Sequence, residues 1–438
     1  MADKYWLKSG FYTMANKLSF LFLGFGSFYM LVRSMPKDEF GIWALFVSIT
    51  TMIETGRNGL IQNSLIKSLV DPTKSKADVI SASLMLNAIT TLFFLVLYIG
   101  LYLFLPLAPE YALLKPMMLF YCITTVALFP LSQCNFIQQG SFDFKGIFFT
   151  SILRQGSFFV VVLYYYINNI SFDLIALVNW QSLSVVLGAI CAYLFCRKYI
   201  EHSWPVKRSL VLELFHYGKF TMGTNISSML FKSIDQLMLG WFMHPAAVAV
   251  YNAAIRVNNL VEYPASAMVE VLFPKSAQKA AEGGIEAVAK LYHTSLAYML
   301  AIFLPAVVAI ELLAYPLIML AAGEEYLESV NILRVVAFAG LAIPFTRQFG
   351  LVMDSTGHPH LNFRMLLVNV VCNLICNFIF IRWMGIMGAA IGTSIAYLIN
   401  AVLSQMVLHT VMKVDYKLLP FLYVQVHRDI FKKLLKKG

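Results

Sequence analysis

The sequence predicts an all-α polytopic membrane protein with twelve transmembrane helices in two pseudo-symmetric six-helix bundles. Of its 438 residues, 59% are hydrophobic and 13% are charged, and the mean hydropathy is +0.72. Soluble domains contain about 45–50% apolar and about 25% charged residues. A soluble chain of this size needs far more polar surface. The composition therefore excludes a soluble enzyme, a disordered chain and a fibrous protein, and it leaves a helical membrane protein.

The helix count comes from windows of about 20 mostly apolar residues, the length that crosses a bilayer. Twelve such windows can be placed along the chain. Two of these windows are less apolar than the rest. The second contains Glu54 and Arg57, and the eighth contains Arg256 and Glu262. The windows cover residues 10–33, 40–66, 79–105, 113–138, 146–168, 172–196, 214–243, 246–273, 290–313, 328–352, 362–383 and 386–412.

The distribution of basic residues predicts the orientation. With the N-terminus placed in the cytoplasm, 21 of the 33 Lys and Arg residues fall on the inner side, four on the outer side and eight inside the windows. This asymmetry follows the positive-inside rule and places both termini in the cytoplasm. The net charge of +10 thus reflects topology, and we expect no nucleic-acid partner. Residues 413–438 mix apolar with basic side chains, which is typical of an amphipathic helix on an anionic leaflet.

The two halves of the sequence resemble each other. At an offset of 208 residues, GFYTM at 10–14 aligns with GKFTM at 218–222, and Glu54 aligns with Glu262. Six windows per half make the repeats parallel, which places a substrate site between the halves. The predicted organisation is an N-terminal bundle (1–200), a cytoplasmic linker (201–213), a C-terminal bundle (214–412) and a basic amphipathic cytoplasmic tail (413–438).

Four short stretches resemble motifs of a known family. They are SIDQLMLG at 233–240, VYNAA at 250–254, GEEY at 323–326 and MDSTG at 353–357. With twelve windows in two groups, they look like the Wzx-type oligosaccharide flippases of polysaccharide biosynthesis. That family belongs to the multidrug/oligosaccharidyl-lipid/polysaccharide (MOP) exporter superfamily, so the resemblance implies a MATE-like fold.

The resemblance also implies a function. Members of the family move undecaprenyl-pyrophosphate-linked oligosaccharides across the bacterial inner (cytoplasmic) membrane for the synthesis of O-antigen lipopolysaccharide, capsule or exopolysaccharide. The expected partners are the lipid-linked oligosaccharide and membrane lipids, together with a glycan polymerase and chain-length machinery. The resemblance implies no enzymatic activity, no metal site and no cofactor, although Na⁺ or H⁺ coupling fits such a transporter.

Charged residues inside the windows are the candidate site, because such residues are costly in lipid and normally face a polar interior. Cations outnumber acids there, as an anionic diphosphate cargo requires. Arginine suits a diphosphate because its planar guanidinium forms paired hydrogen bonds. The predicted cationic cavity consists of Lys17, Arg57, Arg154, Arg256 and Arg347. The predicted coupling or gating residues are Glu54, Asp235 and Glu262.

Simpler roles remain open for these residues. Glu54 and Arg57 are three positions apart on one helix and could neutralise each other. Lys232 and Asp235 have the same spacing. The other cations could be held by ion pairs between helices. The sequence does not distinguish these roles from cargo binding.

Other functions are also compatible with a helical membrane transporter. A MATE-like multidrug or cation antiporter commonly carries an acidic residue in its first span, whereas the first window here contains Lys17 and Arg33 and no acid. A lipid II-type flippase carries a similar diphosphate cargo but usually has two more spans. A membrane glycosyltransferase usually needs a sizeable outer loop, which this sequence lacks.

Overall fold

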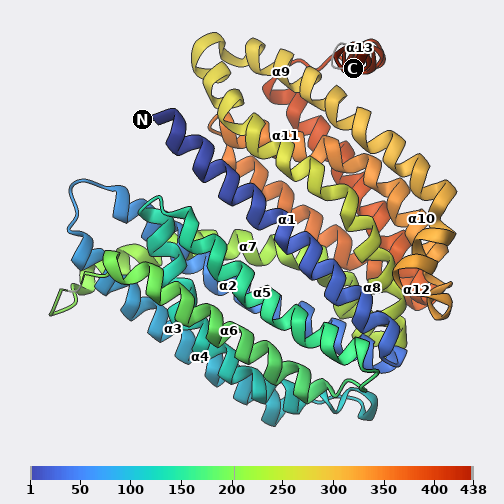
Figure 1. Cartoon of the computed structure of the whole chain (residues 1–438). Helices are drawn as coiled ribbons and strands as arrows, with labels where there is room; N and C mark the ends of the chain where they lie inside the picture. The colour runs from blue at the N-terminus through green and yellow to red at the C-terminus, as the bar shows by residue number, and fades with distance from the viewer. Residues whose placement is uncertain (1, 202, 436–438) are drawn as a thin grey trace. The chain divides into compact units, whose positions relative to one another are not determined.

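The computed structural model describes the backbone of residues 2–201 and 203–435 (Figure 1). Side chains are described for residues 12–201, 203–261, 276, 284–358, 360–426 and 428. Every regular element in the described backbone is helical. The first seven α-helices are α1 (Ala2–Ser34), α2 (Lys37–Val70), α3 (Lys76–Phe104), α4 (Leu114–Gly140), α5 (Phe144–Ile167), α6 (Leu174–Cys196) and α7 (Arg208–Phe242). The others are α8 (Pro245–Asn258), α9 (Glu262–Ala321), α10 (Ser329–Ala339), α11 (Ile343–Ser355), α12 (Pro359–Val411) and α13 (Leu418–Leu435).

Two long helices are each divided by one glycine. Gly284 in α9 has φ 63° and Gly385 in α12 has φ 60°. This left-handed region is readily accessible only to glycine, so the chain leaves the helical path at these positions. Each helix thereby forms two legs, which correspond to separate windows in the sequence. A short 3₁₀ turn, Gly340–Ala342, joins α10 to α11.

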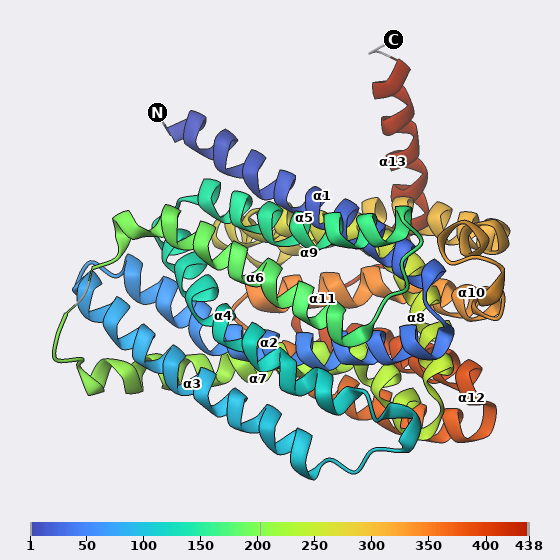
Figure 2. The same cartoon turned by 60° about the horizontal axis from the view of Figure 1, so that its bottom comes forward.

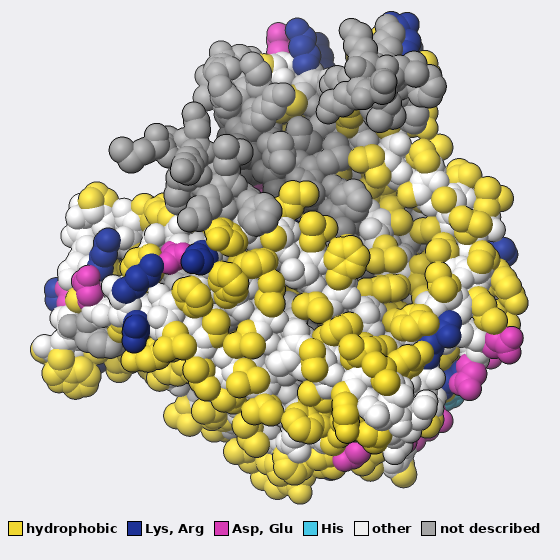
Figure 3. All heavy atoms as spheres, viewed as in Figure 1, with side chains coloured by type: hydrophobic (Ala, Val, Ile, Leu, Met, Phe, Trp, Pro, Cys, Tyr) yellow, Lys and Arg dark blue, Asp and Glu magenta, His cyan; other side chains and the backbone are white. Residues whose placement is uncertain are grey.

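The apolar helices confirm an all-α polytopic membrane protein. Eight stretches of the described chain are long and apolar enough to cross a membrane, and one of them, His360–Val411, contains both legs of α12. Helices α2 and α7 are equally long but contain the charged residues Glu54, Arg57 and Asp235. Apolar side chains cover most of the described surface in Figure 3, and charged side chains gather near its margins. Such a surface suits contact with lipid.

The chain separates into two compact units. Unit 1 comprises Met1–Met229 and His244–Ala249, and unit 2 comprises Leu230–Met243 and Val250–Gly438. The division falls inside α7, so this helix contributes residues to both units. The bundle and linker boundaries expected at residues 200, 213 and 412 stay a prediction.

The core of unit 1 joins α2, α3, α4 and α6 to the first turns of α7. Leu60, Ile61 and Leu65 of α2 are almost completely buried in it. Leu210, Val211 and Leu214 of α7 belong to the same apolar cluster. Burying such side chains contributes roughly 1.5–3 kcal/mol each relative to exposure in water. The first half of α7 is therefore an integral part of unit 1.

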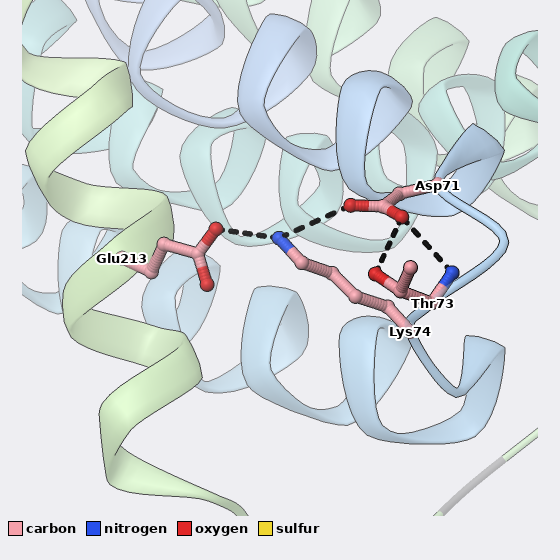
Figure 4. A network of polar contacts seen from close by, with 4 residues as sticks. All are labelled: Asp71, Thr73, Lys74 and Glu213. Carbon is pink, nitrogen blue, oxygen red and sulfur yellow. Dashed lines mark hydrogen bonds and ion pairs between the residues drawn. The ribbon is translucent and has the colours of Figure 1, made fainter.

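A polar network strengthens the same junction (Figure 4). Lys74 Nζ in the turn between α2 and α3 lies 2.5 Å from Glu213 Oε1 on α7 and 3.9 Å from Asp71 Oδ2. The hydroxyl and the backbone N–H of Thr73 both donate to Asp71 Oδ1, at 2.6 and 3.0 Å. These hydrogen bonds, with a smaller contribution from Lys74, lower the pKa of Asp71. The exposed ion pairs add little stability, but the one between Lys74 and Glu213 connects α7 to the turn between α2 and α3.

The core of unit 2 lies where the second leg of α9 meets α11 and the end of α12. Leu296 of α9, Val352 of α11 and Leu408 of α12 are completely buried there. Helix α10 packs against both α9 and α12. The second half of α7 joins this unit through Asn373 Nδ2 of α12, which donates to the carbonyl of Phe231 at 3.1 Å.

Candidate functional site

Unit 2 contains a cavity of about 220 Å³ between its helices. Helix α7 contributes Lys232 and Asp235, one turn apart, and α11 contributes Arg347. Phe231 and Tyr397 form an edge-to-face pair with ring centroids 4.9 Å apart. The cavity is lined by Phe231, Lys232, Asp235, Ile255, Asn258, Asn259, Val336, Gly340, Ile343, Arg347, Thr393 and Tyr397. It therefore combines two cations and one carboxylate with amide, hydroxyl and aromatic groups.

Asp235 is the most deeply buried charged group of this cavity, with 3% of its surface exposed. The hydroxyl of Tyr251 on α8 donates to Asp235 Oδ2. The backbone N–H of Gln236 donates to Oδ1 at 2.8 Å, and Thr393 Oγ1 on α12 lies 3.5 Å from Oδ2. A buried carboxylate is costly unless such donors surround it. Three separate parts of unit 2 thus converge on this one side chain.

Two asparagines of α12 extend the Asp235 cluster. Asn377 Nδ2 donates to Asn373 Oδ1 at 2.7 Å and to Thr393 Oγ1 at 3.0 Å. Both asparagines are buried, with 0% of their surface exposed. Asn377 Oδ1 is buried without a hydrogen bond among the described residues. The cluster presents a carboxylate, amide oxygens and a hydroxyl, which are groups able to hold a proton or a small hard cation.

The sequence analysis singled out Asp235 but missed Asn373, Asn377 and Thr393. A signal was present, because Asn369, Asn373 and Asn377 recur every four residues on one face of a largely apolar window. Thr393 follows the bend at Gly385 and gave no comparable signal. Its proximity to Asp235, 158 positions earlier in the chain, depends on the tertiary fold.

Unit 1 holds a second group of predicted site residues. Arg154 Nη1 of α5 lies 3.6 Å from Glu54 Oε1 of α2. Arg57, one turn further along α2, is 2% exposed and donates from Nη2 to the carbonyl of Leu128 at 3.1 Å and to Ser132 Oγ at 3.2 Å. Arg57 Nη1 has no hydrogen-bond partner in the described part of unit 1. The ion pair of Glu54 is therefore made between helices, while Arg57 is directed toward α4.

The other predicted residues occupy different positions. Lys17 on α1 and Arg256 on α8 have exposed side chains. Arg256 shares its helix with Asn252, which is buried and donates to Gln236 Oε1 at 3.1 Å. The side chain of Glu262 lies outside the described residues. The cavity of unit 2 thus brings Asp235 and Arg347 together, and unit 1 brings Glu54, Arg57 and Arg154 together. The roles of all eight stay predictions.

An exchange of charges tests whether Glu54 and Arg154 act as a pair. Glu54→Arg and Arg154→Glu should each lower the thermal stability, since breaking a partly buried pair leaves an uncompensated charge. The double variant Glu54→Arg with Arg154→Glu should recover most of that stability, because it restores an ion pair with the charges exchanged. Thermal unfolding of the two single variants and of the double variant provides the comparison. A double variant no more stable than the worse single variant would show that the two side chains do not act as a pair.

Solved structures of membrane transport proteins share this helical fold. One is an inward-facing multidrug resistance MATE family transporter of the MOP superfamily, with a TM-score of 0.78, 15% identity, and coverage of 89% of this chain and 93% of that one. Another is the lipid II flippase MurJ in an inward closed conformation, with a TM-score of 0.78, 15% identity, and coverage of 98% and 93%. These likenesses confirm the predicted fold.

A family model described as "Polysaccharide biosynthesis protein" matches residues 30–331, and the chain belongs to this family. The resemblance in the sequence is thereby confirmed. A probable low-salt glycan biosynthesis flippase, Agl15 of Haloferax volcanii, is 24% identical over 43% of this chain and 40% of its own length. An uncharacterized membrane protein of Methanocaldococcus jannaschii, MJ1068, is 25% identical over 57% and 50%. The chain spans about half the length of the curated relatives it matches.

Proposed function

We propose that this protein is a flippase that moves a lipid-linked oligosaccharide across the cytoplasmic membrane by alternating access. The observation that carries the proposal is the unit 2 cavity, which is lined by Lys232 of α7 and Arg347 of α11. Membership of the polysaccharide biosynthesis family and the flippase named among its relatives support the same function. Transport of a bound lipid needs no covalent chemistry, so the proposal includes no enzymatic step.

The chemistry of the cavity indicates how the cargo would bind. A diphosphate would take paired, charge-assisted hydrogen bonds from Arg347 and an ammonium contact from Lys232. The amides of Asn258 and Asn259 and the ring of Tyr397 would meet the hydroxyl groups and faces of the sugars. The apolar lipid tail would remain in the bilayer. We further propose an undecaprenyl pyrophosphate carrier, a product used in O-antigen, capsule or exopolysaccharide synthesis, cytoplasmic termini, and a polymerase with chain-length machinery as partners.

A gradient of protons or monovalent cations would drive the cycle through the Asp235 cluster. Asp235 lines the cavity and also belongs to the buried oxygen cluster with Asn373, Asn377 and Thr393. Occupation of the cluster by a cation would change the net charge beside Arg347 and Lys232. The affinity of the cavity for an anionic head group would therefore depend on the coupling ion.

The function can be tested with purified protein in vesicles that contain a fluorescent undecaprenyl-pyrophosphate oligosaccharide. Flipping is measured by the access of a membrane-impermeant quencher to the labelled sugar. Arg347→Gln should slow flipping at least tenfold, because about 1.5–3 kcal/mol of charged hydrogen bonding is lost. Arg364→Gln, an exposed arginine of α12 outside the cavity, is the matched control and should change the rate less than twofold.

The same preparation separates the rival cargoes. Efflux of a cationic dye without flipping of the labelled lipid would contradict the proposal in favour of a MATE-like antiporter. If lipid II is flipped with equal or greater efficiency, the proposed cargo would be a peptidoglycan precursor and not a lipid-linked oligosaccharide. Equal flipping rates for the native protein and for Arg347→Gln would show that the cavity does not take part in transport.

A further inference from the structure

Helix α13, residues Leu418–Leu435, runs across α9 and α12 of the same unit rather than along them (Figures 1 and 2). Figure 1 shows α13 nearly end-on, although α9 and α12 extend across the picture. Figure 2 shows α13 from the side, again crosswise to these helices. Because α9 and α12 contain membrane-spanning stretches, a crosswise helix runs roughly parallel to the membrane plane. This orientation is that of an interfacial helix.

Contacts with α9 and with the end of α12 hold α13 in place. Val426 is 5% exposed and belongs to an apolar cluster with Ala297 and Ala301 of α9. In the connection that precedes α13, the backbone N–H of Asp415 donates to His293 Nε2 at 2.9 Å. The hydroxyl of Tyr416 donates to Gln405 Oε1 of α12 at 3.1 Å. The connection is therefore attached to both α9 and α12 a short distance from Val411, the end of α12.

Large apolar side chains of α13 remain uncovered by the protein. Phe421 is 69% exposed and Val424 is 65% exposed, whereas Val426 on the other side of the helix is buried against α9. The helix that holds α13 also exposes Val308 and Leu312, at 50% and 76%. Lipid covers such side chains on a membrane-spanning helix. The exposed side of α13 is therefore apolar, like the exposed surface of α9.

The basic residues of the C-terminal segment, 413–438, indicate which kind of surface α13 contacts. Residues 413–438 contain seven Lys or Arg residues and two Asp residues. Among the described side chains, Lys417 and Arg428 are exposed. Apolar side chains beside clustered basic residues fit a bilayer surface rich in anionic lipids, which attracts juxtamembrane cations. We infer that α13 lies on an anionic leaflet, with Phe421 and Val424 in the acyl boundary and its basic residues at the lipid phosphates.

The test uses the full chain in vesicles of phosphatidylcholine and phosphatidylglycerol. Val424→Cys is labelled with bimane and exposed to lipids carrying a shallow doxyl quencher. Ser75→Cys, in the exposed turn before α3, is the matched control for a water-facing site. The native chain, with six cysteines, is labelled in parallel to give the background. We expect at least threefold stronger quenching at Val424 than at Ser75.

A second arm tests the charge. Lys417→Gln with Arg428→Gln, or vesicles of phosphatidylcholine alone, should weaken quenching of the Val424 label at least twofold. Quenching at Val424 equal to that at Ser75 would overturn the inference. Disulfide-linked dimers of Val424→Cys that form in place of lipid quenching would also overturn it, by assigning the exposed side to a second copy of the chain.

Discussion

Replacing Asp235 with asparagine should abolish gradient-driven transport while leaving the folded protein intact. Asparagine has the shape of aspartate, and its single carbonyl oxygen can still accept one of the two hydrogen bonds that Tyr251 and Gln236 donate to different oxygens of the native residue. The substitution removes the negative charge, which is the property that binds a proton or a cation. A loss of at least 100-fold is expected, equivalent to about 2.7 kcal/mol. Flipping is measured in vesicles with an imposed proton or sodium gradient.

The matched control for this prediction is Asp354→Asn. Asp354 lies in the last turn of α11, and its two carboxylate oxygens each accept a hydrogen bond from Asn362 Nδ2 at 3.0 Å. It is not one of the residues that line the unit 2 cavity, so its substitution should change transport less than threefold. Native rates in the Asp235→Asn variant would show that the cluster is structural. Loss of sodium dependence with retained proton dependence would separate the two candidate ions.

Replacing Gly218 with alanine should have the largest effect on stability. A β-carbon at position 218 would lie 1.8 Å from the carbonyl oxygen of Leu60, so α7 would have to move away from α2. Both partners at this contact are backbone, so a side-chain adjustment cannot relieve the overlap. We expect a loss of about 3 kcal/mol or more, as in severe overpacking. Thermal unfolding in detergent and the yield of monodisperse protein measure the effect.

Gly223→Ala provides the matched control five residues later on the same helix. A β-carbon there would have no atom within 4 Å. Alanine favours a helix over glycine by about 0.8–1.0 kcal/mol, so this variant should be as stable as the native protein or slightly more stable. Equal loss of stability in both variants would indicate that glycine serves the flexibility of α7, and the close approach to Leu60 would then not explain the effect.

Most of the helical architecture could be predicted from the sequence because apolar length is a local property. The windows at 362–383 and 386–412 lie on the two legs of α12, and Gly385 falls between them. In the same way Gly284 precedes the window at 290–313. Glycine at these positions supplies a backbone conformation that other residues rarely adopt, so the sequence contains the physical reason for each interruption.

The site could be predicted only in part because its partners meet through tertiary packing. The cost of charge in lipid was enough to identify Asp235 and Arg347. The spacing of Glu54 and Arg57 was compatible with a pair within one helix, but the ion pair of Glu54 is with Arg154 on α5. Helical spacing describes neighbours on one helix and cannot describe which faces of two helices meet. For the same reason Thr393 was not linked to Asp235.

The division of α7 has a consequence for how a chain of two similar halves is assembled. Leu210 and Val211 precede the window at 214–243 and Leu214 begins it, yet all three are buried in the core of unit 1. In an assembly of two separate half-length chains, this arrangement would be an exchanged segment, as in domain swapping. A half-protein that ended before residue 208 would leave the apolar cluster of unit 1 without Leu210, Val211 and Leu214. In the single chain the start of α7 is covalently joined to the unit in which it packs. In two half-length chains the same packing would require their association and would depend on protein concentration.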